Sequence, residues 1–153
     1  MNRFAALFEA LDATTKTGAK TAALADYFRT APEPDRVWTV ALLTGRRPRR
    51  AVNATELRLW AAEAAGIPDW LFEESYTVVG DLAETIALLL PQPVATADIT
   101  LDGAIRGLTR LTGQPAEVRK AAVLHAWSQL PATERFLYNK LLTGGFRMGV
   151  AQG

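Results

Sequence analysis

Apolar residues recur at helical spacing along almost the whole chain, and this periodicity predicts an all-α protein. The pattern begins with an i, i+3, i+4, i+7 stripe at Phe4, Leu7, Phe8 and Leu11. Nothing beyond a short extended patch near the C-terminus indicates a strand. We therefore expect a compact bundle of about nine short helices. After the first stripe, the expected helices cover residues 18–30, 33–45, 53–65, 68–79, 81–90, 101–111, 115–130 and 133–142.

Several helix ends carry recognisable capping signals. Asn53 with Glu56 three residues later is typical of a capping box, and Gly66 is placed to end the helix that follows. Asp81 with Glu84 has the same spacing and predicts another helix start. Clustered carboxylates could also indicate acid-base catalysis or a Mg²⁺ site, but we prefer a structural explanation because two of them fit capping and the other two diverge as neighbours on a helix. These carboxylates are Asp81 and Glu84, and Glu73 and Glu74.

Aromatic and aliphatic side chains in the middle of the chain are expected to face the core. The stripe Leu71, Phe72, Tyr76 and Val79 marks the inward side of the 68–79 helix. Tryptophans at inward helical positions are core side chains more often than base-stacking platforms. The four tryptophans of the chain are Trp38, Trp60, Trp70 and Trp127.

The chain contains an internal repeat. Sliding it by 99 positions aligns residues 20–45 with 119–144 without a gap, with 8 identities, and both segments end on Leu-Leu-Thr-Gly. Arg36 then lies over Arg135. Alanine-rich helices also align by chance, which is the alternative explanation. A true repeat predicts two three-helix units in pseudo-two-fold related halves, an arrangement that suits duplex DNA.

Charge is segregated along the chain although the net charge is only +1. Residues 1–50 carry nine basic and five acidic side chains, residues 51–105 carry one and nine, and residues 106–153 carry seven and two. Two basic units flanking an acidic one are compatible with a phosphate-binding face. Chance clustering on a solvated surface is the alternative.

Length and composition exclude several classes of protein. A chain of 153 residues and 16.6 kDa fits a single domain, residues 1–153. The chain has no cysteine and one histidine, so disulfides, thiolate metal sites, a cysteine nucleophile and a histidine cluster are all excluded. No apolar run is long enough to cross a membrane, and we expect a cytoplasmic monomer with no membrane partner.

A cluster of arginines follows the first Leu-Leu-Thr-Gly sequence and is the strongest candidate for binding chemistry. Planar guanidinium donors suit phosphate oxygens, and glycines let a backbone approach a groove wall. An exposed loop without a ligand is the alternative. The second Leu-Leu-Thr-Gly sequence and the start of the 18–30 helix supply further candidates. At the helix start, backbone amides without helical partners add partial positive charge that favours a phosphate. The candidate DNA-binding residues are Lys16, Lys20, Arg46, Arg47, Arg49, Arg50, Lys140, Gly144, Gly145 and Arg147.

Three longer strings of residues resemble a known family, the N-terminal DNA-binding domain of ATP-dependent DNA ligases, especially bacterial ones. The resemblance covers essentially the whole chain and implies an all-helical domain that holds nicked duplex DNA across the minor groove. It also implies a role in DNA repair, replication and recombination. The strings are Glu73-Glu74-Ser75-Tyr76, Val79-Gly80-Asp81-Leu82-Ala83-Glu84-Thr85 and Asn139-Lys140-Leu141-Leu142-Thr143-Gly144-Gly145-Phe146-Arg147-Met148-Gly149-Val150.

The resemblance also defines what the chain lacks. Ligases of this family take AMP from ATP on the lysine of a Lys-x-Asp-Gly motif. The sole Asp-Gly pair here is Asp102-Gly103, and Thr100 occupies the lysine position. We therefore expect a fragment or isolated domain without the nucleotidyltransferase and OB domains, with no catalytic residue, cofactor or metal. ATP and Mg²⁺ belong to the complete ligase. The alternative function is a helical protein-interaction domain that docks a partner through its acidic middle segment.

Overall fold

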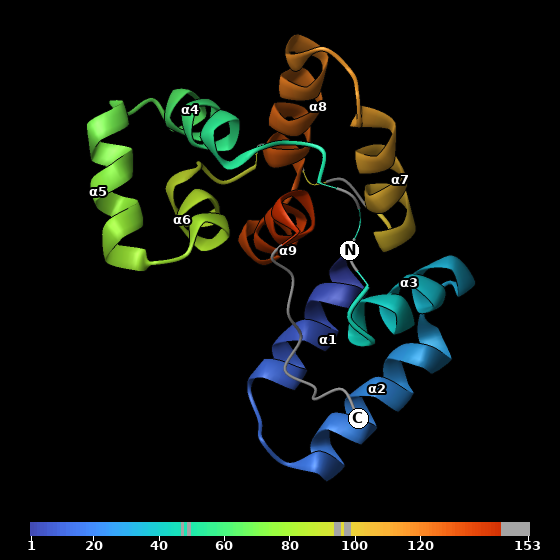
Figure 1. The fold of residues 1–153 in the computed structure, drawn as a ribbon. Helices are drawn as coiled ribbons and strands as arrows, with labels where there is room; N and C mark the ends of the chain where they lie inside the picture. Colours follow the sequence, from blue (N-terminus) through green and yellow to red (C-terminus); the bar gives the residue numbers. More distant parts are fainter. Residues whose placement is uncertain (47, 49, 94–95, 97–98, 145–153) are drawn as a thin grey trace.

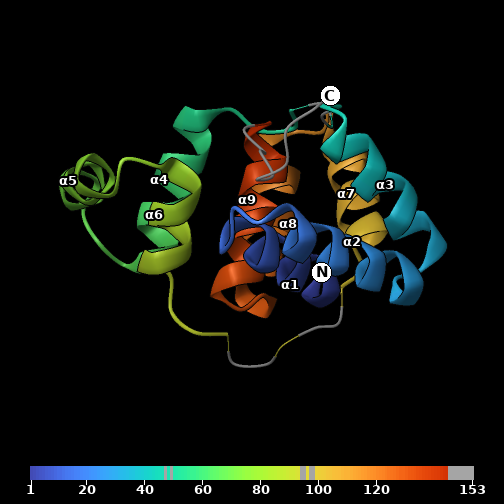
Figure 2. The same cartoon turned by 90° about the horizontal axis from the view of Figure 1, so that it is seen from below.

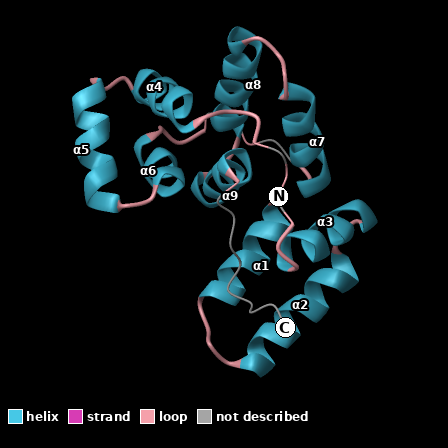
Figure 3. Cartoon of the chain, in the orientation of Figure 1, coloured by secondary structure: helices cyan, strands magenta, loops and turns pink. Residues whose placement is uncertain are grey.

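The computed structural model describes residues 1–46, 48, 50–93, 96 and 99–144, and within these ranges the regular structure is entirely α-helical (Figure 3). The prediction of an all-α fold of about nine helices is confirmed. The helices of the described residues are α1 (Asn2–Asp12), α2 (Thr17–Thr30), α3 (Glu33–Leu43), α4 (Ala54–Ala65), α5 (Asp69–Val79), α6 (Leu82–Leu89), α7 (Leu101–Leu111), α8 (Ala116–Gln129) and α9 (Ala132–Thr143).

The described helices form three groups of three that follow one another along the chain (Figure 1). The first group, α1 to α3, and the basic last group, α7 to α9, meet where α3 packs on α7 and α9 packs on α1. The first group is itself balanced in charge, because the excess of basic side chains in residues 1–50 lies in the arginine segment after α3. The acidic middle group, α4 to α6, lies beside the last group, with α6 against α9 and α4 against α8. Figure 2 shows the same arrangement from below, with α5 at the outer edge.

The helix bounds repeat at the offset found in the sequence. Both ends of α7 lie 99 positions after those of α1, and both ends of α8 lie 99 positions after those of α2. The start of α9 lies 99 positions after the start of α3. The two outer groups therefore share one order of helices and one set of helix lengths, within a residue.

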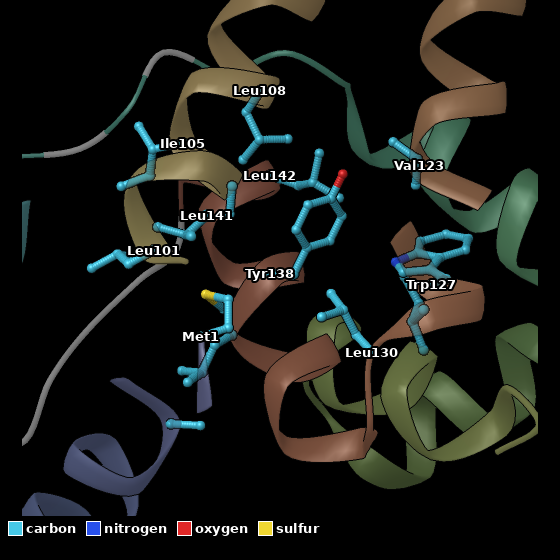
Figure 4. Packing of buried hydrophobic residues seen from close by; sticks show 14 of the residues in the cluster. Met1, Leu101, Ile105, Leu108, Val123, Trp127, Leu130, Tyr138, Leu141 and Leu142 are labelled. Atoms are coloured by element: carbon cyan, nitrogen blue, oxygen red, sulfur yellow. The ribbon is translucent and has the colours of Figure 1, made fainter. Parts of the chain in front are cut away.

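Helix α9 is the centre of the hydrophobic core (Figure 4). It packs on α1, α6 and α7, and its Leu137, Leu141 and Leu142 are fully buried. Trp127 of α8 enters the same cluster, with its indole Nε1 donating to Asn139 Oδ1 at 2.6 Å. Because α9 holds all three groups together, the position of its last turn is fixed by packing.

The capping signals in the sequence operate as expected. Asn53 accepts a hydrogen bond from the Glu56 amide, and Glu56 closes the capping box of α4. Gly66 ends that helix with a φ of 70°, in the left-handed region that favours glycine. Asp81 accepts a hydrogen bond from the Glu84 amide and begins α6. Both N-cap residues, Asn53 and Asp81, thus begin a helix as the spacing predicted.

The orientation predicted for α5 is partly wrong. Phe72 is buried as expected, but Leu71 and Val79 are exposed and Trp70 is 67% exposed. Only one narrow side of α5 is covered, because the helix lies at the edge of the described part of the molecule and packs mainly on α4 and α6. An apolar stripe in the sequence cannot reveal that a partner helix is missing on one side.

Candidate nucleic-acid interface

The chain leaves α3 through a glycine turn that sets the direction of the arginine segment. Gly45 has a φ of 93°, its amide donates to the Leu42 carbonyl, and the Arg46 amide donates to the Ala41 carbonyl. This pair of bonds is a Schellman motif, which satisfies the last carbonyls of a helix and needs a left-handed residue. Arg46 is exposed directly after the turn.

Arg50 connects the segment after α3 to the end of α9. Its Nε and Nη2 donate to the Thr143 carbonyl at 3.1 and 2.9 Å, and Thr143 is the final residue of α9. A cation at this position also opposes the negative end of the helix dipole. The side chain remains exposed, so the Arg50 guanidinium can meet solvent or a ligand while it holds the two segments together.

The segment that carries Arg50 is anchored on α8. Arg119 makes a two-pronged ion pair with Glu56, with N–O distances of 2.7 and 3.0 Å, and its Nη1 also donates to the Ala51 carbonyl at 3.5 Å. The hydrogen bond from Arg119 is the main reason why the pKa of Glu56 is lowered. Both ends of the segment, Gly45 and Asn53, are therefore fixed by turns or caps.

A recess of about 350 Å³ lies beside this segment. Gly113 and Gln114, in the turn between α7 and α8, form its far side, and Gly113 has a φ of 81°. Helix α8 begins next to this turn without a side-chain cap, which leaves backbone amides available to an anion. Sequence reasoning missed this turn, although extending the repeat upstream pairs Gly113 with Thr14, in the turn before α2.

Lys16 and Lys20 lie at the corresponding place in the first group. Lys16 is exposed at the N-cap position of α2, which likewise has no side-chain cap, and Lys20 is half-buried in the next turn. Figure 1 shows this turn at the lower edge of the view, away from the segment after α3. Within the described residues the structure does not bring the two lysines next to Arg50.

Lys140 has a different environment from the other candidates. Its Nζ forms an ion pair with Asp81 and lies 5.4 Å from the centre of the Phe136 ring. Burial alone would raise the pKa of Asp81, but hydrogen bonds from Lys140 and from the Glu84 amide outweigh it and lower the pKa. The ion pair compensates the charge of Lys140, so this side chain attracts phosphate less than an unpaired cation would.

Gly144 ends α9 as Gly45 ends α3. Its φ is 69°, and the two glycines occupy matching positions of the repeat. Four further candidates lie outside the described residues: Arg47, Arg49, Gly145 and Arg147.

The described residues hold cations and amides at helix ends but no metal-binding constellation. No group of three or more His, Asp or Glu side chains is close enough to hold an ion within the described part of the chain. None of the described helices is both long and apolar enough to span a membrane. The available chemistry is that of anion binding by guanidinium groups, ammonium groups and backbone amides.

A comparison with models of protein families matches the whole chain. The model of a family described as DNA ligase N terminus matches residues 1–153, the whole chain. No curated protein matches it.

Proposed function

The chain belongs to the family of DNA ligase N-terminal domains, and from this premise we propose that it binds duplex DNA without sequence preference. In this proposal the domain holds nicked DNA through its phosphates and minor groove, as the DNA-binding domain of an ATP-dependent ligase in DNA repair and replication. Phosphate contacts fix the position of a protein on a duplex and carry no base information.

The bond between Arg50 and the end of α9 is the observation that supports the proposal most strongly. It holds the basic segment after α3 against the last turn of α9, where the second copy of the Leu-Leu-Thr-Gly sequence ends. The segment that follows the first repeat unit therefore contacts the end of the second unit. A duplex with its own approximate two-fold symmetry can then be held by one unit on each side.

The uncapped starts of α2 and α8 are the second element of the proposal. Each follows a turn at the matching repeat position and leaves amides free for a phosphate oxygen. Lys16 adds a charge beside the first start, and Arg50 lines the recess beside the second. We expect one phosphate-binding point in each half.

We propose that the domain acts together with the catalytic domains of a ligase in a cytoplasmic protein. The Lys-x-Asp-Gly nucleophile motif does not occur in the chain. ATP and Mg²⁺ are therefore assigned to the catalytic domains, and DNA is the partner assigned to the chain itself.

A salt titration on a labelled nicked duplex tests the proposal. If about five or six phosphates are contacted, log affinity should fall against log salt with a slope of about −5. Replacing Arg46, Arg47, Arg49 and Arg50 together with alanine should make the slope shallower by about 0.9 for each phosphate lost. No binding at low salt, or a slope near zero, would disprove the proposal. An intact duplex of the same sequence measures the preference for a nick.

A further inference from the structure

Helix α6 exposes one large apolar side chain between two hollows. Leu88 is 63% exposed and lines both of them. One hollow, of about 630 Å³, lies between α1, α6 and α9, and the other, of about 390 Å³, lies between α5 and α6. We call this region the Leu88 surface and define it by residues Phe8, Asp12, Glu74, Val78, Glu84, Leu88 and Phe136.

The Leu88 surface exposes large apolar side chains around both hollows. Val78 is 84% exposed, and the rings of Phe8 and Phe136 lie 5.8 Å apart in the wall of the larger hollow. Single exposed apolar residues are normal, but several that surround hollows mark interaction sites on soluble proteins. None of the residues that define this surface belongs to the DNA proposal, although Lys140, a DNA-binding candidate, also lines the larger hollow.

The charge of the Leu88 surface is negative. Asp12, Asp81 and Glu84 line the larger hollow together with one cation, Lys140, which is paired with Asp81. Neither Asp12 nor Glu84 takes part in an ion pair among the described residues, and Glu74 lines the second hollow. Such a surface repels phosphate and attracts an apolar ligand that carries positive charge.

We propose that the Leu88 surface docks a basic amphipathic helix of a partner protein. Apolar side chains of that helix enter the hollows on both sides of Leu88, and its lysines or arginines pair with Asp12, Glu74 and Glu84. A helix is the favoured occupant because two hollows beside a ridge fit side chains spaced one turn apart. The described residues also offer no sheet edge that an extended peptide could join.

A synthetic peptide provides the probe. It is about four helical turns long, contains leucine on one face and lysine on the other, and carries a fluorescein label. Fluorescence anisotropy measures its binding to the whole chain, with a peptide in which glutamate replaces every lysine as the control. We expect the leucine-lysine peptide to bind and the leucine-glutamate peptide to bind at least 10-fold more weakly.

Two matched variants locate the binding. Leu88→Ser removes the ridge, and Val37→Ser removes an equally exposed side chain (63%) on α3. Leu88→Ser should weaken peptide binding about 10-fold, whereas Val37→Ser should change it less than 2-fold. Circular dichroism checks that both variants stay folded. Both should bind nicked DNA like the parent, so this proposal and the DNA proposal can fail independently.

Several outcomes would overturn the proposal. Equal effects of the two variants, or no preference for the lysine peptide, would show that the surface does not select a basic helix. Self-association that Leu88→Ser abolishes, measured by sedimentation, would identify a second copy of the chain as the occupant. Leu88-dependent binding of ligase catalytic domains added in trans would identify an intramolecular contact instead.

Discussion

Replacing Arg135 should reveal how the central helix is held in place. Arg135 is only 2% exposed, and burial lowers the pKa of its guanidinium group. It donates to the Trp127 carbonyl near the end of α8, to the Ala87 and Leu90 carbonyls at the end of α6, and to the Pro91 carbonyl. One side chain therefore satisfies carbonyls that the ends of two helices leave without partners.

The size of the effect follows from these acceptors. Arg135→Met keeps most of the side-chain volume but leaves four carbonyl groups without this donor. At about 1 kcal/mol for each buried group left unsatisfied, the loss is about 4 kcal/mol. Removing a buried charge recovers part of it, so we expect a decrease of about 3 kcal/mol in the free energy of unfolding. For a chain of this length, the melting temperature should fall by about 6–12 °C.

Arg36, the repeat partner of Arg135, is the matched control. Its Nη1 donates to the Phe28 carbonyl, the equivalent of Trp127, at 3.4 Å, and its Nε is buried without a hydrogen-bond partner. Arg36→Met should therefore lower the free energy of unfolding by less than about 1 kcal/mol. Urea unfolding followed by circular dichroism measures both variants. Equal losses, within about 0.5 kcal/mol, would refute the assignment of the helix-end carbonyls to Arg135.

Three further predictions concern the DNA site, the missing activity and pH. Arg147→Ala should weaken binding to nicked DNA, whereas Arg29→Ala, which removes a cation paired with Asp26, should not; gel shifts with equal affinities would exclude the C-terminal copy from the site. Incubation with labelled ATP should leave no AMP on the chain, and any covalent adduct would contradict this prediction. Because the folded-state pKa of Asp81 is lowered from 3.8, its stabilisation is present above that pH and is lost as the pH falls through the folded value. Lys140→Met should therefore reduce the difference in urea midpoint between about pH 6 and about pH 3, whereas Lys120→Met, which breaks the more exposed pair with Glu63, should change it little.

The helices were predictable because local signals determine where they begin and end. The capping box at Asn53 and Glu56 and the left-handed Gly66 depend on residues within a few positions of one another. The orientation of α5 was not predictable in the same way. Trp70 is a large apolar side chain of the kind that is usually buried, yet it is exposed. Its exposure depends on the absence of a neighbouring helix on that side, which is a property of the whole fold.

The candidate site was predictable in its residue types and not in its contacts. The arginine run after Gly45 is visible in the sequence, but the bond from Arg50 to Thr143 joins residues 93 positions apart. The same limit applies to Arg119, whose pairing with Glu56 spans 63 positions and anchors the segment instead of leaving the guanidinium free. Sequence spacing identifies charges, whereas tertiary packing decides which charges are already compensated.

The two longest sequence strings that resemble ligases, residues 79–85 and 139–150, contact each other through their described residues. Asp81 of the 79–85 string pairs with Lys140 of the 139–150 string, and Asn139 Nδ2 donates to the Ala83 carbonyl at 3.2 Å. These contacts join α6 to α9, so this part of both strings is explained by helix packing without reference to DNA. The last turn of α9, which Arg50 contacts, is placed by the same packing. Lys140 therefore supports the proposed DNA site chiefly by positioning α9, and the phosphate contacts are expected from exposed residues such as Arg46 and Arg50.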